Sequence, residues 1–320
     1  MADDLLSLIW GYRLSQAIHV IATLGIPDLI GDAPRNPAEL AAATDADAAS
    51  LRRLLRALAA YGVVAEDEHG RFRLTELGQR LRTDAPGSLR DVAISLFRSP
   101  MWAAWGRLDE SVRTGESAFR IVHDVGIWEF RAAHPEEGRA FDNAMVAQTR
   151  AAAGMILAAY DFGAAKIVVD VGGGRGALLE AVVTAHPDTE GVLFDQPQVV
   201  DGVDLGPRIQ IVGGSFFDSV PAGGDLYVLK WILHDFDDAA AAQILRTIRA
   251  ACGPEARLLV IERDLTDPET TLSDLQMLVV LGGRERSQTE YSELLLSSGF
   301  ALSRSIRTDG PLTVLEALPV

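Results

Sequence analysis

The sequence of 320 residues contains a single cysteine, Cys252, which excludes a framework of disulfide bonds and is typical of a protein of the reducing cytoplasm. The six histidines are scattered, and none forms the i, i+4 pair of a helical zinc site, so we expect no metal. No apolar run approaches the length of a membrane span, and the start, Met1-Ala-Asp-Asp4, is acidic and unlike a signal peptide. We therefore expect a cytoplasmic protein with no membrane partner.

Basic residues are also scarce, because 29 Lys and Arg stand against 45 Asp and Glu, which gives a formal net charge of −16 at pH 7. Such a surface repels phosphates, so a nucleic acid partner is disfavoured. Hydrophobic residues make up 48% of the chain, which at this length is enough for a large core and for two domains.

Residues 4–24 are rich in Leu, Ile, Val and Ala around Trp10 and Tyr12 and carry few charges. A helix with this composition needs a covering surface. We interpret it as part of a subunit interface in a homodimer; a helix buried within its own chain is the alternative.

The next segments have the order helix, helix, hairpin, helix, which is the order of a winged-helix module. They are a short helix opened by Asn36, a helix over 47–61, a hairpin of 63–65 and 71–74, and a helix from Thr75.

A transcription factor of this type would place the second helix in the major groove, with Arg52, Arg53 and Arg56 on its polar side. Acidic residues outnumber basic ones over residues 1–100, so the module lacks the positive charge that phosphate binding needs. A winged-helix regulator stays as an alternative, and we expect these arginines to form a solvated face or salt bridges at the subunit interface.

Residues 99–159 are again helical in pattern and hold an unusual share of large flat and flexible side chains. Small-molecule pockets are lined by such groups, although core packing is the simpler explanation for any one of them. They are Met101, Trp102, Trp105, Phe119, Trp128, Phe130, Phe141 and Met145.

From residue 161 onward, strand candidates alternate with helices, which is typical of a parallel sheet with crossover helices. The candidates are 166–171, 191–195, 208–212, 225–230, 257–262, 301–307 and 312–317. The connection between the last two allows only an antiparallel return, as expected of methyltransferases and not of nicotinamide dehydrogenases. We predict an α/β chain of three parts: a winged-helix-like dimerisation domain at 1–90, a helical connector at 91–160 and a Rossmann-like catalytic domain at 161–320.

The strand Lys166–Val171 runs into a turn with glycines at 172, 174 and 176, where backbone N–H groups can approach a polar ligand closely. Asp195 ends the next strand, where a carboxylate can accept hydrogen bonds from ribose hydroxyls. Gly172, Gly174 and Ala177 also satisfy the dinucleotide fingerprint, so a nicotinamide-dependent oxidoreductase stays open.

Ligands of an open parallel sheet bind beyond the carboxyl ends of its strands. There, Ser215 and Phe216 follow the third strand and could meet an adenine, and His234 follows the fourth. A histidine with an ordinary pKa can take a proton from a hydroxyl, and a nearby carboxylate would fix its tautomer. Glu262, at the end of the next strand, and Glu285, on a glycine-opened loop, are the candidates for that carboxylate. A helix cap for His234 and surface positions for the two acids are the alternatives.

Six ordered segments resemble the motifs of the S-adenosylmethionine-dependent O-methyltransferases of the plant caffeate and bacterial polyketide type. They are Asp170–Gly176, Phe194–Pro197, Gly213–Phe217, Leu229–Asp235, Val260–Glu262 and Gly282–Arg286. The match covers nearly the whole chain, and the family's order of dimerisation, helical and cofactor domains is the same.

The resemblance implies that His234 is the catalytic base, with Glu262 and Glu285 beside it. It assigns the cofactor to Gly172, Asp195, Phe216 and Lys230, and we add Gly174 and Ser215 from the same two loops. It assigns the acceptor to Met145, and we add Phe141 and Trp231. Plant members usually carry an acid where Ser215 stands. The implied reaction is transfer of a methyl group from S-adenosylmethionine to a phenolic or enolic hydroxyl of an aromatic small molecule of secondary metabolism.

Overall fold

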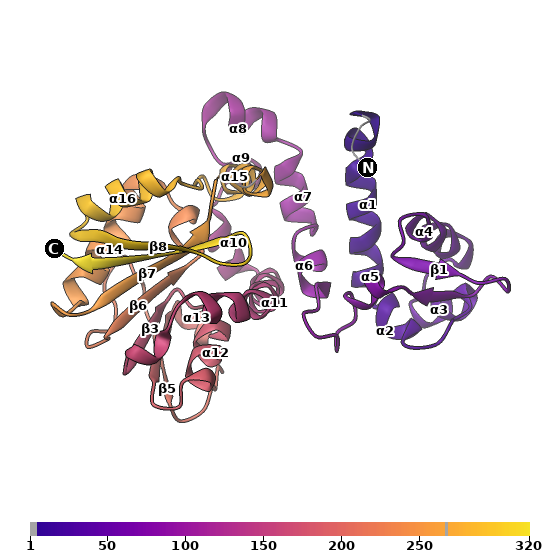
Figure 1. Ribbon diagram of the computed structural model, residues 1–320. Helices are drawn as coiled ribbons and strands as arrows, with labels where there is room; N and C mark the ends of the chain where they lie inside the picture. The colour runs from indigo at the N-terminus through magenta and orange to yellow at the C-terminus, as the bar shows by residue number, and fades with distance from the viewer. Residues whose placement is uncertain (1–4, 266–267) are drawn as a thin grey trace. The chain divides into compact units, whose positions relative to one another are not determined.

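The computed structural model describes residues 5–265 and 268–320, which form two compact units (Figure 1). The first unit is Met1–Trp102 with Glu136–Gln148, and the second is Ala103–Pro135 with Thr149–Val320. The boundaries expected from the sequence at residues 90 and 160 stay a prediction.

The first unit begins with helices and a short antiparallel hairpin around one apolar core. Its elements are α1 (Leu5–Thr23), α2 (Ile26–Ile30), α3 (Pro37–Ala43), α4 (Ala48–Ala60), β1 (Val64–Glu66), β2 (Phe72–Leu74), α5 (Glu76–Gln79) and α6 (Arg90–Ser95). The expected caps are present, because the Asn36 side chain accepts from the Ala38 N–H and the Thr75 side chain accepts from the Gly78 N–H. The helix, helix, hairpin order is therefore confirmed, and the winged-helix likeness itself stays a prediction.

Helix α1 leaves its amino-terminal half uncovered. Only Ile21 and Ala22 of this helix are buried. The exposed large apolar side chains of α1 are Leu5, Leu6, Leu8, Ile9, Trp10, Tyr12 and Val20. An apolar surface of this kind marks an interaction site.

The arginines on α4 form ion pairs within the first unit. Arg52 lies 3.1 Å and Arg56 lies 3.3 Å from the carboxylate of Glu66 on β1. Both arginines therefore join α4 to the hairpin of their own unit, and the salt bridges expected at the subunit interface stay a prediction.

A series of helices follows, as expected for residues 99–159. It consists of α7 (Ser99–Trp105), α8 (Leu108–Thr114), α9 (Ala118–His123), α10 (Ile127–Ala133) and α11 (Pro135–Ala159), with the short 3-10 helix η1 (Phe162–Ala164) after them.

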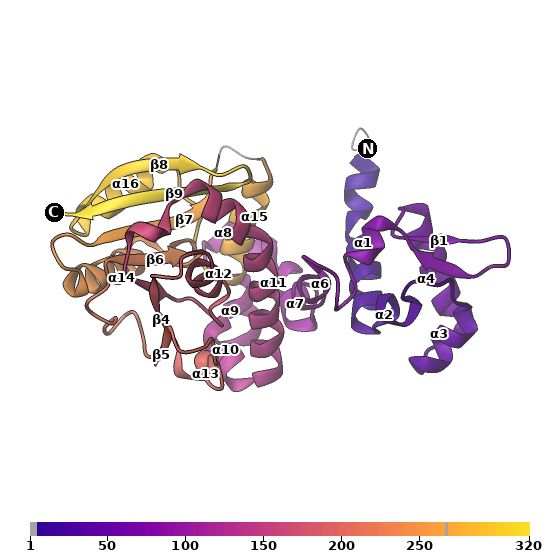
Figure 2. The ribbon, with the colours of Figure 1, turned by 60° about the horizontal axis from the view of Figure 1, so that its bottom comes forward.

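The second unit contains a seven-stranded sheet of order β5-β4-β3-β6-β7-β9-β8. The first five strands are parallel, and β8 and β9 are antiparallel to each other and lie along one edge of the sheet, in yellow in Figure 2. The strands are β3 (Ile167–Val171), β4 (Glu190–Asp195), β5 (Ile209–Gly213), β6 (Leu226–Lys230), β7 (Arg257–Arg263), β8 (Phe300–Arg307) and β9 (Leu312–Pro319).

The seven expected strands and the antiparallel return are confirmed. The sequence did not predict that β9 lies between β7 and β8, where it pairs antiparallel with β7. The sheet is covered on both faces, which explains the nearly continuous apolar strands. One face packs on α14 (Asp238–Ala251) and α16 (Gln288–Ser297), and the other packs on α12 (Ala177–Ala185), α13 (Pro197–Val200) and the carboxyl-terminal part of α11.

The chain reverses its direction of progress across the sheet between β3 and β6, which are neighbours. This topological switch point leaves a crevice at the carboxyl ends of the parallel strands. The segments that follow β3, β4, β5, β6 and β7 all begin at that edge. Together with the last residues of these strands, they include each residue that the sequence assigned to the cofactor or to catalysis.

No helix within residues 5–265 and 268–320 combines the length and the hydropathy that a membrane span requires.

The turn after β3 depends on a glycine for close packing, which gives a first prediction. A β-carbon at Gly173 would lie 2.6 Å from both Asp170 Oδ2 and Leu193 Cδ1. Gly173→Ala should therefore lower the free energy of unfolding by about 1–3 kcal/mol, measured by urea denaturation without cofactor. Gly253→Ala is the matched control, because a β-carbon there meets no atom within 4 Å. Equal stability of the two variants would contradict this account of the turn.

Candidate active site

The glycine turn joins β3 to α12 with three residues in the left-handed region. Gly172, Gly174 and Gly176 have φ of +71°, +60° and +82°. A β-carbon on Gly174 would meet no atom within 4 Å, so the backbone here borders open space. Because a side chain would be strained at this φ, the turn stays free of a β-carbon at Gly174 and a ligand can approach its backbone closely.

Asp195 at the end of β4 reaches this turn. Its Oδ2 accepts a hydrogen bond of 2.7 Å from the Gly174 N–H, and its Oδ1 accepts one of 2.6 Å from the Gln196 N–H. Burial raises the pKa of Asp195, and these two hydrogen bonds oppose the rise. The two features that the sequence placed at one site therefore do lie together.

Phe216 lies beside the same turn. A β-carbon on Gly172 would lie 3.5 Å from Phe216 Cε1 and 2.5 Å from Ile232 Cδ1, so both side chains border the glycine. The Phe216 ring packs edge-on against Phe217 and Phe236. The Ser215 hydroxyl accepts a hydrogen bond of 3.2 Å from the Phe217 N–H, so this serine shapes the loop that presents Phe216.

A buried pair of opposite charges lies beneath the turn. Asp170 on β3 is 3% exposed, and Lys230 ends the neighbouring strand β6, where its Nζ donates a hydrogen bond of 2.8 Å to Thr149 Oγ1. Burial raises the pKa of Asp170 to about 7, and the charge of Lys230 opposes this. Burial lowers the pKa of Lys230 to about 7, and Asp170 opposes that shift in turn. Asp170 and Thr149 were not among the expected site residues.

These features fit S-adenosylmethionine in the chemistry of the groups that they offer. The backbone at Gly174 offers a polar turn to a nucleoside, and the carboxylate of Asp195 offers an acceptor for its hydroxyls. The ring of Phe216 offers an aromatic surface for its base. Their roles as cofactor contacts stay a prediction.

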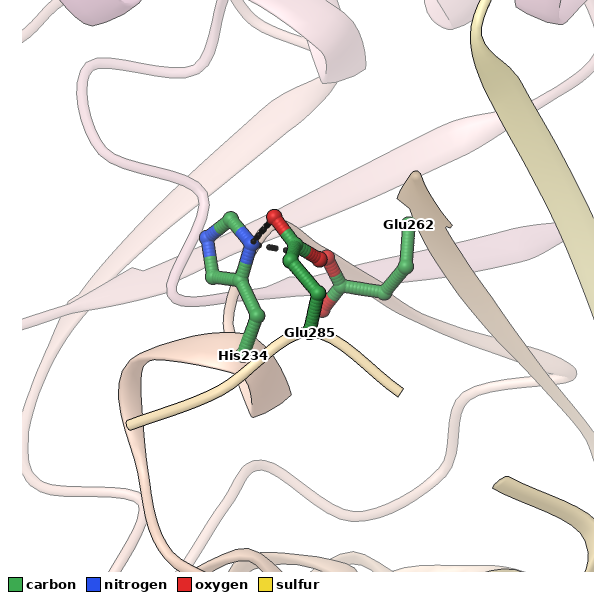
Figure 3. Close-up of side chains that lie close together, drawn as sticks. All are labelled: His234, Glu262 and Glu285. Atoms are coloured by element: carbon green, nitrogen blue, oxygen red, sulfur yellow. Dashed lines mark hydrogen bonds and ion pairs between the residues drawn. The ribbon is translucent and has the colours of Figure 1, made fainter. Parts of the chain in front are cut away.

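A second group of side chains surrounds His234 in the 3-10 helix η2 (Leu233–Asp235). Its Nδ1 lies 3.0 Å from Glu285 Oε1 and 3.3 Å from Glu262 Oε2. Figure 3 shows this nitrogen facing the two carboxyl groups, and the other ring nitrogen on the far side of the ring. That nitrogen, Nε2, lies 3.3 Å from Asp235 Oδ1. The structure therefore brings together all three residues that the sequence proposed for catalysis.

Each of the two glutamates is held by further hydrogen bonds. Glu262 Oε1 accepts from the backbone N–H groups of Ile232 and Leu233 at 3.2 and 3.0 Å. Glu285 Oε1 accepts from the Ser273 hydroxyl at 2.8 Å. Both carboxylates are thus fixed in place, and Glu262 also supports the backbone that carries the imidazole.

The electrostatics of the cluster favour a protonated imidazole. Burial opposes the charge of His234, but Glu262, Glu285 and Asp235 outweigh it and raise the pKa of His234 to about 9. Burial raises the pKa of Glu262 to about 7 and that of Asp235 to about 6, and in both the charge of His234 opposes the shift. Burial also acts against the charge of Glu285, yet the hydrogen bond and the charge of His234 hold its pKa below the ordinary value.

Two residues that the sequence did not single out position His234. A β-carbon at Gly283 would lie 2.2 Å from the His234 carbonyl oxygen, so the loop that carries Glu285 touches the backbone of η2. Arg286 is 1% exposed and donates hydrogen bonds of 2.7 and 2.8 Å to the carbonyls of Leu233 and Phe236. These contacts fix the separation between the base candidate and its carboxylate.

The three expected acceptor residues have different outcomes. Trp231 follows Lys230 at the carboxyl end of β6, and the Lys230 Nζ lies 3.4 Å from its ring centroid. Phe141 and Met145 lie on α11, in the stretch that belongs to the first unit. Their role as acceptor contacts stays a prediction.

One atom each of His234, Glu262 and Glu285 lies within 4.8 Å of the others, a compactness that could also hold a metal ion. The direct contacts of 3.0 and 3.3 Å are those of a hydrogen bond and an ion pair, which a charged imidazole between carboxylates explains. The expectation of no metal stays a prediction.

The mixed sheet with its antiparallel edge, the glycine turn and the nucleoside-type groups at the switch point define a methyltransferase that binds a nucleoside cofactor. The family model for the O-methyltransferase domain matches residues 105–301, and the model for the O-methyltransferase dimerisation domain matches residues 6–84. The chain therefore belongs to the O-methyltransferase family, uses S-adenosylmethionine and forms a homodimer through its dimerisation domain.

Individual relatives support this assignment. The chain is 44% identical to the O-demethylpuromycin-O-methyltransferase of Streptomyces alboniger, over 99% of this chain and 89% of the relative. It is 40% identical to the phenazine O-methyltransferase PhzM of Lysobacter antibioticus, over 100% of this chain and 97% of the relative. A crystal structure of NcsB1, an O-methyltransferase from neocarzinostatin biosynthesis, in complex with S-adenosylmethionine and 2-hydroxy-5-methyl naphthoic acid is 35% identical, with a TM-score of 0.86 and full coverage of both chains. The chain is thus an S-adenosylmethionine-dependent O-methyltransferase, which decides against the oxidoreductase and the winged-helix regulator.

The contact at Gly283 gives a second prediction. Gly283→Ala should displace the backbone of His234 and Asp235, and an error of this kind in a catalytic group lowers kcat by roughly 100-fold. The affinity for S-adenosylhomocysteine, measured by calorimetry, should change little, because the turn at Gly172–Gly176 is untouched. Gly253→Ala is again the control. A folded Gly283→Ala enzyme with normal kcat would show that this contact does not position the imidazole.

Proposed function

We propose that this O-methyltransferase methylates a phenolic or enolic hydroxyl of an aromatic or polyketide-type small molecule, with His234 as general base. The observation that supports the base is the fixed contact of Nδ1 with Glu285 at 3.0 Å. When the ring is neutral, this contact favours the tautomer with its proton on Nδ1. The Nε2 lone pair is then available to a hydroxyl of the acceptor.

S-adenosylmethionine supplies a methyl group that is already activated on a sulfonium, so the protein chiefly provides alignment and one proton acceptor. In this proposal the backbone at Gly172 and Gly174 and the carboxylate of Asp195 hold the polar part of the nucleoside. Phe216, presented by the Ser215 turn, packs on the adenine, and Lys230 supports the turn from below.

Glu262 and Glu285 have two tasks in the proposed reaction. Before proton transfer they orient the ring through Nδ1, and after it they stabilise the imidazolium. The raised pKa of His234, about 9, makes the imidazole a strong proton acceptor once it is neutral.

The proposed acceptor class rests on the apolar and aromatic character of Phe141, Met145 and Trp231 and on the aromatic acceptors in the names of the relatives. A cytoplasmic location, which the single cysteine Cys252 suggests, is part of this proposal.

Replacement of the proposed base gives a third prediction. His234→Gln should lower kcat by roughly 10²–10⁴-fold, because the proton acceptor is lost. Binding of S-adenosylhomocysteine should stay within a few-fold of the wild type. Methyl transfer to a panel of phenols is measured by mass spectrometry. The exposed His69 provides the control variant His69→Gln. If His234→Gln turned over as fast as the wild type, His234 would not be the general base, and the enzyme would catalyse the reaction by positioning its substrates.

The pH dependence of catalysis gives a fourth prediction. Only the neutral imidazole can accept a proton, and the pKa of His234 is raised to about 9, so kcat/KM should increase with pH and level off above that value. In Glu285→Gln the charge that favours the imidazolium is lost. The rising limb should therefore move to lower pH, by roughly one unit or more.

The limb could instead arise from the hydroxyl of the acceptor, so the profile is measured with two phenols of different acidity. A limb that follows the phenol, and does not move in Glu285→Gln, would contradict the assignment to His234.

A further inference from the structure

Trp231 has a backbone conformation that is unusual for a large side chain. Within the described residues, the non-glycine positions with positive φ are Asp45, Asp124 and Trp231, the last at +56°. Aspartate adopts this region readily, whereas for a bulky residue it is a strained outlier. The strained backbone therefore fixes the orientation of the indole at a cost to the stability of the fold. Trp231 lies directly after β6, at the edge of the sheet that carries His234.

The indole is also incompletely satisfied. Its Nε1 is buried and has no hydrogen-bond partner among the residues that the structure describes. A buried donor without an acceptor destabilises the protein, so an acceptor atom on a bound molecule would relieve this loss.

A second donor group lies next to the ring. The Cζ of Arg263 is 5.1 Å from the ring centroid of Trp231. Among the side chains that the structure describes, those of residues 5–265 and 270–320, no carboxylate forms an ion pair with this guanidinium and no group forms a hydrogen bond with it. Lys230, the other cation on the ring, differs because its Nζ donates to Thr149. Arg263 is only partly buried, so its charge is available to a ligand.

The sheet explains why these groups share one place. Strands β6 and β7 are parallel neighbours with Lys230 opposite Ile261, so Trp231 and Arg263 both lie at their carboxyl ends. Arg263 follows Glu262 directly, and its charge acts on both Glu285 and Lys230. The two donors therefore lie at the same edge of the sheet as His234.

From the proposed function we infer that Arg263 and the indole N–H of Trp231 bind a carboxylate of the acceptor, whose substrate class is then the hydroxylated aromatic acids. A guanidinium and an N–H without acceptors match the oxygens of a planar carboxylate, and charge-assisted hydrogen bonds of this type are among the strongest in proteins. The net charge of −16 repels anions in general, so an acidic acceptor needs a local cation of this kind.

The test compares isomeric hydroxybenzoic and hydroxynaphthoic acids with their methyl esters, which keep the ring and the hydroxyl but lose the negative charge. Binding to the protein saturated with S-adenosylhomocysteine is measured by calorimetry, and turnover is measured with S-adenosylmethionine. The wild type should prefer at least one acid over its ester.

Arg263→Gln should weaken the binding of that acid by roughly 10- to 100-fold, seen mainly as a higher Kd and KM. The binding and the turnover of the ester should stay unchanged. Trp231→Phe, which removes the five-membered ring with its N–H and keeps one aromatic ring, should cause a smaller loss in the same direction. Arg307→Gln removes the same charge from an exposed arginine of the same unit and should affect neither compound.

The inference is overturned if no acid binds better than its ester, or if Arg263→Gln weakens acid and ester equally, which would make Arg263 a neutralising charge for Glu285. These outcomes differ from failure of the proposed function. If the proposed function were wrong, the wild type would methylate neither the acid nor the ester. The difference in Kd between acid and ester, measured by calorimetry, would still show whether the carboxylate site exists.

Discussion

The buried carboxyl groups of Glu262 and Glu285 and the partly buried one of Asp235 surround the imidazole of His234, and their charges must be balanced where water screens them poorly. As a result the pKa of the imidazole is raised, and the protonation of the neighbouring acids depends on the charge of the imidazole. Because the three acids come from η2, the end of β7 and the loop before α16, the same attraction holds three separate segments together. The chemistry that we propose, acceptance of one proton from a hydroxyl, uses this balance directly.

The edge of the sheet is divided between two tasks, and β6 connects them. On one side, the turn after β3, Asp195 and the loop with Phe216 offer groups that suit a nucleoside. On the other side, His234 and its carboxylates offer a proton acceptor. Lys230 and Trp231 end β6 between the two. This arrangement follows from the switch point, because β3 and β6 are neighbours whose continuations diverge.

Most of the fold could be predicted from the sequence, because parallel strands covered on both faces are continuous apolar runs and glycines mark where they end. The pairing of His234 with Glu262 followed from the order of the strands. The contributions of Gly283, Arg286 and Thr149 could not be predicted in this way. Thr149 is 81 positions away from Lys230 in the sequence, so their hydrogen bond depends on tertiary packing. Arg286 donates to backbone carbonyls, and because every residue has one, no residue type in the sequence indicates such a contact. The insertion of β9 beside β7 likewise depends on packing.

Glu262 and Glu285 fix the tautomer of His234, and together with Asp235 they raise its pKa. Nitrogen-15 NMR of the histidine-labelled dimer, assigned with the His234→Gln variant, measures both quantities in one titration. The account predicts that the neutral ring carries its proton on Nδ1 and that it becomes protonated with a pKa of about 9. A proton on Nε2 in the neutral ring, or a pKa at or below the ordinary value of about 6.5, would contradict it.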